Sequence, residues 1–254
     1  MSLVLIPVGE QSPGGFDNGR ITERRPVMFV HRGAHTDRLG PLFYWAWAVA
    51  EKGGFIAEHA HQGFEIISYV LEGTIEHRDS LGTWKALGAG ALQVMQTNAG
   101  VSHSERFVDG MRSAMFQIWF EPDLRETVTL PPSYIDFPAD AFPWIHAGGN
   151  RIKHLVGEGS PAVLRTDAHM HDIVVRPRGS LTLTKSNVYA VLVAISGTGT
   201  VSVGDQSVAL TTGDAAIARP GAQQSVVVNA SDEEFRYVQV MVPVHTPYPL
   251  YPNQ

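Results

Sequence analysis

The chain contains no cysteine among its 254 residues, which excludes disulfide bonds, zinc fingers and thiolate chemistry. Any bound metal must therefore be held by histidine and carboxylate side chains. Positive charge is also scarce, because the net charge is −6 and the pI is near 6.0. This balance offers no basic surface to a phosphate backbone, so we expect no direct nucleic-acid contact.

Long apolar runs are missing as well. No stretch of roughly 18 consecutive apolar residues occurs, so no membrane-spanning helix is expected. Residues 1–15 lack a basic stretch followed by a long apolar run, which argues against a signal peptide. We therefore expect a cytoplasmic protein without membrane association.

Helical periodicity is rare, and short segments that alternate apolar and polar residues take its place. These segments are separated by many of the 25 glycines and 16 prolines, a pattern typical of an all-β sandwich or barrel. The proline-rich stretch 123–140 has no sustained period. It is predicted as a linker or crossover with one helical turn near Leu124–Thr127. The clearest alternating segments are 66–71, 181–184, 200–203, 225–228 and 237–242.

Two segments on either side of this stretch are similar to each other. "YVLEGTIEHRDSLGTWKALGAGAL" (69–92) and "VAISGTGTVSVGDQSVALTTGDAA" (193–216) share a pattern of short strands joined by glycine turns. Such an internal repeat predicts two similar β domains in tandem. We expect a metal-binding domain over 1–122, a linker over 123–140 and a second domain without metal ligands over 141–254.

Four side chains in the first domain form a candidate metal site. Residues two apart in a strand face the same side, so His59 and His61 share a face, as do His103 and Glu105. If the two strands are neighbours, three imidazoles and a carboxylate converge. This donor set suits a divalent first-row metal and leaves positions for substrate or oxygen. Glu65 is expected on the same face, as a fifth ligand or as an acceptor that orients a histidine.

The second half lacks this set. The same offsets from its glycines fall on Leu183, Lys185, Val226 and Val228, so we expect no metal there. Another pair, His169 and His171, does not match the repeat and is predicted to mark an exposed strand start. The other histidines have no spaced partner and are predicted to be surface or structural residues: His31, His35, His77, His146, His154 and His245.

Residues 53–107 resemble the cupin superfamily and, within it, the pirin family. The first cupin motif corresponds to Gly53, His59, His61, Glu65 and Gly73, and the second runs from Gly90 to His103. "HAHQGFEIISYVLEGTIEHRDSLG" (59–82) and "GALQVMQTNAGVSHSE" (90–105) are similar to the longer pirin patterns. The two-domain layout extends the resemblance weakly to the whole chain.

The resemblance implies two tandem cupin β-barrels of the jelly-roll type, with one metal in the first. Its ligands correspond to His59, His61, His103 and Glu105. Iron(II) is expected, with copper, nickel, manganese and zinc as alternatives. The resemblance also implies a quercetin 2,3-dioxygenase-like oxidoreductase that cleaves a flavonol with dioxygen and releases carbon monoxide. Glu105, or else Glu65, would act as the base.

Other interpretations remain open. Gln62 and the run Gln96-Thr97-Asn98 depart from the pirin pattern, which bears on the substrate and not on the metal. The aromatic stretch 41–49 either lines a flat apolar pocket for a small aromatic substrate or, as we favour, forms a core strand. Met95, Met115 and Trp119 are equally ambiguous. A non-catalytic metal or redox sensor with a protein partner, and an isomerase or hydrolase that needs no oxygen, are the alternatives to a dioxygenase.

Overall fold

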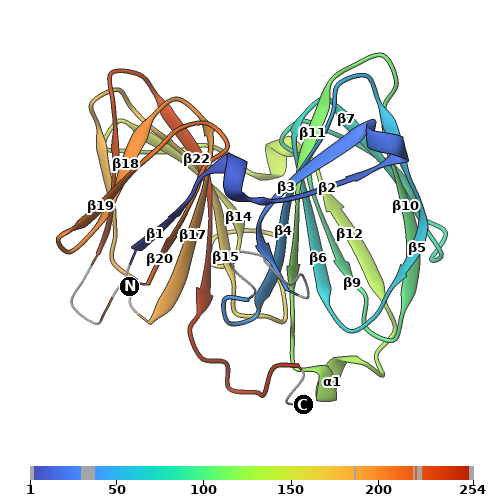
Figure 1. Ribbon diagram of the computed structural model, residues 1–254. Helices are drawn as coiled ribbons and strands as arrows, with labels where there is room; N and C mark the ends of the chain where they lie inside the picture. The colour runs from blue at the N-terminus through green and yellow to red at the C-terminus, as the bar shows by residue number, and fades with distance from the viewer. Residues whose placement is uncertain (1–2, 30–37, 186, 220, 222–224, 252–254) are drawn as a thin grey trace. The chain divides into compact units, whose positions relative to one another are not determined.

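The structure is a computed structural model that describes residues 3–29, 38–185, 187–219, 221 and 225–251. The described chain is almost entirely β, as predicted, and divides into two compact units (Figure 1). The N-terminal unit comprises Ser12–Ala141, Leu164–Thr166 and Pro247–Gln254, and the C-terminal unit comprises Met1–Gln11, Phe142–Val163 and Asp167–Thr246. Each unit thus includes a segment from the far end of the chain, which the continuous ranges 1–122 and 141–254 do not contain.

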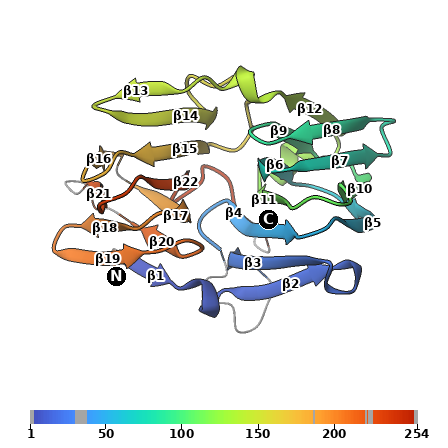
Figure 2. The same cartoon turned by 90° about the horizontal axis from the view of Figure 1, so that it is seen from above.

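The N-terminal unit is built from two antiparallel sheets, with strand orders β12-β9-β6-β11-β4-β3-β2 and β5-β10-β7-β8. Figure 2 shows the four strands of the smaller sheet side by side. Apolar residues from both sheets, such as Met115 and Phe107, meet in one buried cluster, so the sheets form a sandwich. The elements are β2 (Ser12–Phe16), η2 (Asp17–Gly19), β3 (Ile21–Met28), β4 (Leu42–Ala50), β5 (Gly54–His61), β6 (Glu65–Glu72), β7 (Thr74–Asp79), β8 (Trp84–Gly88), β9 (Leu92–Gln96), β10 (Val101–Phe107), β11 (Ser113–Phe120), α1 (Leu124–Thr127), β12 (Ser133–Phe137) and η3 (Ala139–Ala141).

The C-terminal unit has the same construction, with strand orders β1-β20-β17-β22-β15-β14-β13 and β16-β21-β18-β19. Its interior is a large aliphatic cluster that both sheets share. The elements are β1 (Leu3–Ile6), η1 (Val8–Glu10), β13 (Ile145–Ala147), β14 (Asn150–Val156), β15 (His169–Val175), β16 (Ser180–Leu183), β17 (Val188–Ser196), β18 (Gly199–Val203), β19 (Gln206–Leu210), β20 (Ala215–Ala218), β21 (Val226–Ala230) and β22 (Phe235–Pro243).

The internal repeat is confirmed strand by strand. Each strand from β2 to β11 has its counterpart in the same sheet position of the other unit, and β1 takes the place of β12. Gly73 and Gly197 occupy equivalent turns with φ of 69° and 77°. A Cβ atom there would lie 2.4 Å from the Arg112 carbonyl oxygen or 2.1 Å from that of Glu234, so both turns require glycine. Each copy consists of two separate sheets, which is the jelly-roll arrangement and not a closed barrel.

The proline-rich stretch 123–140 contains regular structure. The predicted helical turn is α1, which Asp123 caps by accepting a hydrogen bond from the Arg125 amide at 3.1 Å. The stretch also contains β12, which pairs with β9 at the edge of the larger sheet. The sequence pattern did not predict this strand, because prolines lie on either side of it and it is short.

Among the described residues, no helix has the length and apolar character needed to cross a membrane.

Candidate metal centre

The three predicted histidine ligands lie together at one end of the smaller sheet. β5 and β10 are neighbours, and their antiparallel register sets His59 directly opposite His103. The Nε2 atoms of these two residues are 3.1 Å apart, and the His61 ring centroid is 4.6 Å from that of His59 and 4.9 Å from that of His103. One ligand atom from each of the three lies within 4.8 Å of the others. This group could therefore hold a metal ion.

Glu105 lies beside His103 but belongs to a second group. Its ligand atom and those of His77 and His103 are within 4.8 Å of one another, and all three residues are buried. The register of β10 on β5 shifts between His103 and Glu105, and Glu105 pairs with His77 on the other neighbour, β7. The two groups share His103, which thus links Glu105 to His59 and His61.

The buried histidines are neutral in the metal-free protein. Burial, assisted by the charge of His59, lowers the pKa of His61 to about 4 and that of His103 to about 2. The Nε2 atom of His61 is buried without a hydrogen-bond partner. The Nδ1 atom of His59 lies 2.8 Å from the Ala57 carbonyl oxygen, which orients this ring with Nε2 toward His103. Neutral imidazoles with free nitrogens are what a metal requires.

Glu105 is a carboxyl group with an unusual proton affinity. Burial raises its pKa to about 7, and the hydrogen bond from Gln117 opposes this shift. The Nε2 atom of Gln117 lies 2.9 Å and 3.2 Å from the two carboxylate oxygens. Trp119 in turn donates to the Gln117 side-chain oxygen at 3.3 Å, which fixes the amide. A carboxyl group that titrates near neutral pH is suited to exchanging protons with a substrate.

His77 is a member of this site that the sequence analysis did not find. It is buried, its Nε2 atom lies 3.0 Å from Asp79 Oδ2, and its ring stacks on Tyr134 at 4.6 Å between centroids. The surface interpretation is therefore wrong, whereas a hydrogen-bonded structural role fits. Its ring is also 5.4 Å from that of His103. The available signal was the spacing of His77 and Asp79, which lie two apart on one strand face.

Glu65 does not join the metal ligands. The prediction that it shares their face is wrong, because β5 and β6 belong to different sheets and Gly63, with φ of 89°, turns the chain between them. Glu65 is fully buried and accepts hydrogen bonds from the Arg165 amide at 2.8 Å and the Thr166 amide at 3.0 Å. Gln96 donates a third, at 2.9 Å. Glu65 therefore holds segment 164–166 against the N-terminal unit.

The C-terminal unit carries aliphatic residues at the equivalent positions. His103 pairs with His59 on one side and Asp79 on the other, and in the second copy Val226 pairs with Leu183 and Val203. Glu105 and His77 likewise correspond to Val228 and Val201. All of these valines are buried in the core, and Lys185 is exposed beyond the end of β16. The polar interior is thus confined to one copy.

The second histidine pair begins β15, as predicted, but it is not exposed. Burial lowers the pKa of His171 to about 4, and the His154 ring centroid is 4.7 Å away. His169 is partly buried, with its ring centroid 6.5 Å from that of His171. Within the part of the chain that the structure describes, these residues form no group close enough to hold a metal. His146 and His245 are exposed, and His31 and His35 lie outside the described residues.

A cavity of about 470 Å³ lies beside His61, which is part of its lining. Gln62, one of the departures from the pirin pattern, lines it. The ring centroids of Phe64 and Trp119 lie 5.3 Å and 5.1 Å from that of His61. Trp119 is thus part of the site, whereas Met95 and Met115 are buried core residues. The stretch 41–49 is mainly core strand, with Tyr44, Ala46 and Ala48 buried.

A duplicated two-sheet sandwich with a histidine cluster at the end of one copy defines a bicupin. The Pirin family model matches residues 34–120, which lie in the N-terminal unit and include all the residues of the candidate centre. This part of the chain is similar to the pirin family.

Curated relatives agree with this assignment. A quercetin 2,3-dioxygenase of Escherichia coli is 31% identical over 149 residues, which cover 55% of this chain and 63% of the relative. A putative quercetin 2,3-dioxygenase of Pseudomonas aeruginosa is 41% identical over 113 residues, covering 44% and 49%. The chain therefore aligns with less than two thirds of the length of these relatives.

Solved structures extend the similarity to the whole fold. A bacterial pirin from Escherichia coli in complex with nickel(II) superposes with a TM-score of 0.75 at 21% identity, covering 95% of this chain and 99% of the other. A quercetin 2,3-dioxygenase from Acinetobacter baumannii superposes with a TM-score of 0.78 at 20% identity, covering 99% and 82%. At these identities the comparison concerns the fold.

Proposed function

We propose that the N-terminal unit contains the metal centre of a flavonol 2,3-dioxygenase-like oxidoreductase. The observation that carries the proposal is the set of three mutually close histidines, with Glu105 next to it. One of the three, His61, lines a cavity. The curated relatives named quercetin 2,3-dioxygenase support a small aromatic substrate. A protein partner and the cytoplasmic location remain predictions.

The residues fit a divalent metal. His59, His61 and His103 would hold it, and Glu105 would complete the set from the side of His103. The buried, unpartnered Nε2 atom of His61 supports this assignment, because a nitrogen in such a place otherwise costs free energy. We keep iron(II) as the expected metal. Nickel is the first alternative, because the similar bacterial pirin structure contains it.

When bound, the metal supplies the Lewis acidity and electron transfer that the reaction of a flavonol with dioxygen requires. The protein supplies the proton chemistry and the pocket. Glu105 takes the proton from the acidic hydroxyl of the substrate, and Gln117 keeps its carboxylate in place. Phe64 and Trp119 present ring surfaces beside His61, where a flat substrate can pack. Glu65 is unsuited to be the base, because backbone amides already occupy both of its oxygens.

The direct test is oxygen consumption with quercetin by metal-loaded protein, compared with the Glu105→Gln variant. General-base contributions are typically about 10²–10⁴-fold, so the variant should lose turnover by at least about 100-fold. Metal content should fall much less, because the three histidines remain. Glu58→Gln, an exposed change on β5, is the matched control and should be fully active.

Two outcomes would contradict the proposal. If metal-loaded wild type consumes no oxygen with any flavonol, the enzyme assignment fails and a metal-dependent sensor with a protein partner becomes the preferred function. If Glu105→Gln retains full turnover, the proton is taken by another group.

A further inference from the structure

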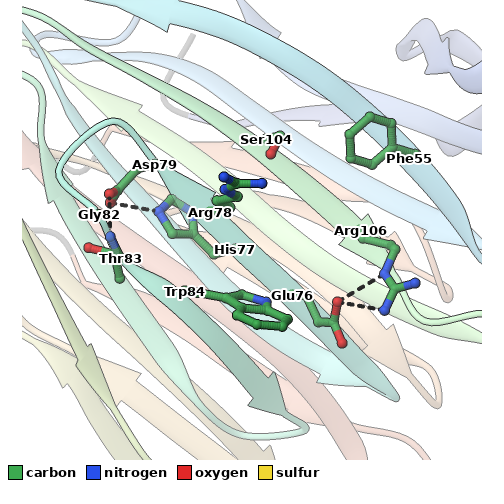
Figure 3. Close-up of a pocket in the computed structure, with 10 residues that line it drawn as sticks. All are labelled: Phe55, Glu76, His77, Arg78, Asp79, Gly82, Thr83, Trp84, Ser104 and Arg106. Atoms are coloured by element: carbon green, nitrogen blue, oxygen red, sulfur yellow. Dashed lines mark hydrogen bonds and ion pairs between the residues drawn. The ribbon is translucent and has the colours of Figure 1, made fainter.

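The smaller sheet of the N-terminal unit has a second functional face. Its inner face carries the histidines, whereas its outer face lines a pocket of about 600 Å³ (Figure 3). Glu76 and Arg78 on β7 line the outer pocket, and the buried His77 and Asp79 of the same strand also belong to its lining (Figure 3). This volume is typical of small-molecule sites. The proposed oxygenase chemistry does not use the outer pocket.

An exposed tryptophan dominates the outer pocket. Trp84 is 76% exposed, although it stands on a regular strand. It lies directly opposite Arg78 on β7, which in turn lies opposite Ser104 on β10. The row Ser104–Arg78–Trp84 therefore presents a hydroxyl, a guanidinium and an indole side by side. Phe55, 49% exposed, also lines the pocket.

Two arginines and two carboxylates line the pocket, so their formal charges balance. Glu76 is neutralised by Arg106, whose Nη2 and Nε atoms lie 2.7 Å and 2.9 Å from its carboxylate (Figure 3). Arg78 has no ion-pair or hydrogen-bond partner for its side chain among the described residues. Asp79 is buried and its oxygens are hydrogen-bonded, so the exposed Arg78 guanidinium is the charge beside the indole ring with which a ligand can pair. A ligand that matches both needs an aromatic ring and a negative group.

The rim of the pocket is already rigid. Asp79 Oδ1 accepts hydrogen bonds from the Leu81 and Thr83 amides, each at 2.9 Å, and Oδ2 binds His77. The turn between β7 and β8 contains Gly82 with φ of 89°. The backbone that carries Trp84 is therefore held by a hydrogen-bonded turn.

We propose that this pocket binds a planar aromatic carboxylate. The ring stacks on Trp84, the carboxylate pairs with Arg78, and the Ser104 hydroxyl donates a further hydrogen bond. The site lies on the opposite face of the sheet from the metal ligands and does not depend on the proposed oxygenase activity.

Calorimetric titration of metal-loaded protein with 2-naphthoate tests the site. The neutral probe 2-naphthamide has the same ring but no charge, so it should bind more weakly. Trp84→Ala should weaken naphthoate binding by about 10-fold, as expected for the loss of a stacking contact of about 1.4 kcal/mol. Arg78→Gln should abolish the preference for naphthoate over naphthamide.

Two controls make the result decisive. Lys85→Gln changes a charge next to Trp84 that points to the opposite face and contacts Asp136, so it should leave binding unchanged. His61→Ala removes a metal ligand and should also leave naphthoate binding unchanged. The proposal is overturned if wild type does not bind naphthoate at millimolar concentration, if Trp84→Ala binds as tightly as wild type, or if only His61→Ala loses binding. The last result would place the probe at the metal centre.

Discussion

His103 is the residue on which the candidate centre depends, because it belongs to both groups of potential ligands. His59 and His61 lie on the neighbouring strand β5, His77 lies on the other neighbour β7, and Glu105 lies two residues further along β10. A metal held by the first group therefore fixes the position of a side chain that also contacts the second. The ligand role of each residue is best tested by metal content, which does not require that the substrate be known.

His61→Ala should reduce bound metal sharply, because it removes one of three imidazoles from the site. The matched control is His169→Ala with His171→Ala, which removes the other closely spaced pair in the chain. That double variant should retain full metal content, measured by elemental analysis after equal loading. Loss of about half the metal from the double variant would show a second site in the C-terminal unit.

Metal binding should release protons in a pH-dependent way. The raised pKa of Glu105, about 7, means that this carboxyl is mostly protonated at pH 6 and mostly ionised at pH 8. If it is a ligand, metal binding displaces its proton, so metal affinity rises with pH up to about 7. His61 and His103 contribute no protons, because their pKa values of about 4 and about 2 keep them neutral.

The comparison with Glu105→Gln isolates this effect. Wild type should release more protons per metal than the variant at pH 6, and the difference should be much smaller at pH 8. Calorimetry in buffers of different ionisation enthalpy measures the difference. An equal release from both proteins at pH 6 would show that Glu105 keeps its proton and is not a ligand.

Gln117 and Gln239 are equivalent residues in the two copies, but only one has a partner. Gln117 donates to Glu105, whereas the C-terminal copy has Val228 at the position equivalent to Glu105. Both polar atoms of the Gln239 side chain are buried without a hydrogen bond. A buried unsatisfied polar group costs about 1–3 kcal/mol.

Gln239→Met should therefore stabilise the protein by about 1–3 kcal/mol in denaturant unfolding, because it removes the polar group and keeps the volume. Gln117→Met should instead destabilise the protein, because it removes the hydrogen bond to the Glu105 carboxylate. A loss of stability in Gln239→Met would indicate that the amide has a partner in solution, such as an ordered water.

At the scale of elements, Glu65 shows how a motif residue can have a structural role. It begins β6 and fixes residues 164–166 through two backbone amides. Glu65→Gln replaces one acceptor oxygen by an NH₂ group, which cannot accept. The amides of Arg165 and Thr166 should then exchange faster with deuterium, since a charge-assisted hydrogen bond is worth about 1.5–3 kcal/mol.

Exposed Glu58→Gln is the control and should leave the exchange of these amides unchanged. Unchanged protection of Arg165 and Thr166 in Glu65→Gln would mean that packing, and not this carboxylate, holds the segment.

Local elements could be predicted from the sequence because their causes are local. The alternation of apolar and polar residues predicted the strands, and the residues after Asp123 predicted the α1 turn. The spacing of His59 and His61 predicted that they lie on one strand. The contacts of Glu65 could not be predicted in this way, since Arg165 and Thr166 are 100 and 101 positions distant. The place of His77 in the site could not be predicted for a similar reason. His77 lies next to Glu105 only because β7 pairs with β10, and the sequence does not show which strands pair.

At the scale of the whole molecule, the two copies share a fold but have opposite interiors. The N-terminal copy buries a polar set around Glu105, and the C-terminal copy replaces it with valines. A buried carboxyl with a raised pKa costs stability, whereas aliphatic packing contributes to it. The second sandwich can therefore be stable without a metal, and the first gains stability when a metal binds its folded form.

Each unit includes a segment from the far end of the chain, and this has a consequence for synthesis on the ribosome. β1 emerges early, but its partner β20 belongs to the last part of the chain, and Val8 bonds to Asp214, 206 positions later. β9 is synthesised before β12, the strand that pairs with its free edge. Because β1 is the counterpart of β12, β1 could pair with this edge of β9 in the meantime. The nascent chain thus offers β1 a wrong edge before the right one. Side chains distinguish β12 from β1 at the edge of β9. The Tyr134 hydroxyl of β12 donates a hydrogen bond to Gln93 on β9, whereas Leu3, at the same position in β1, is apolar and cannot form this bond.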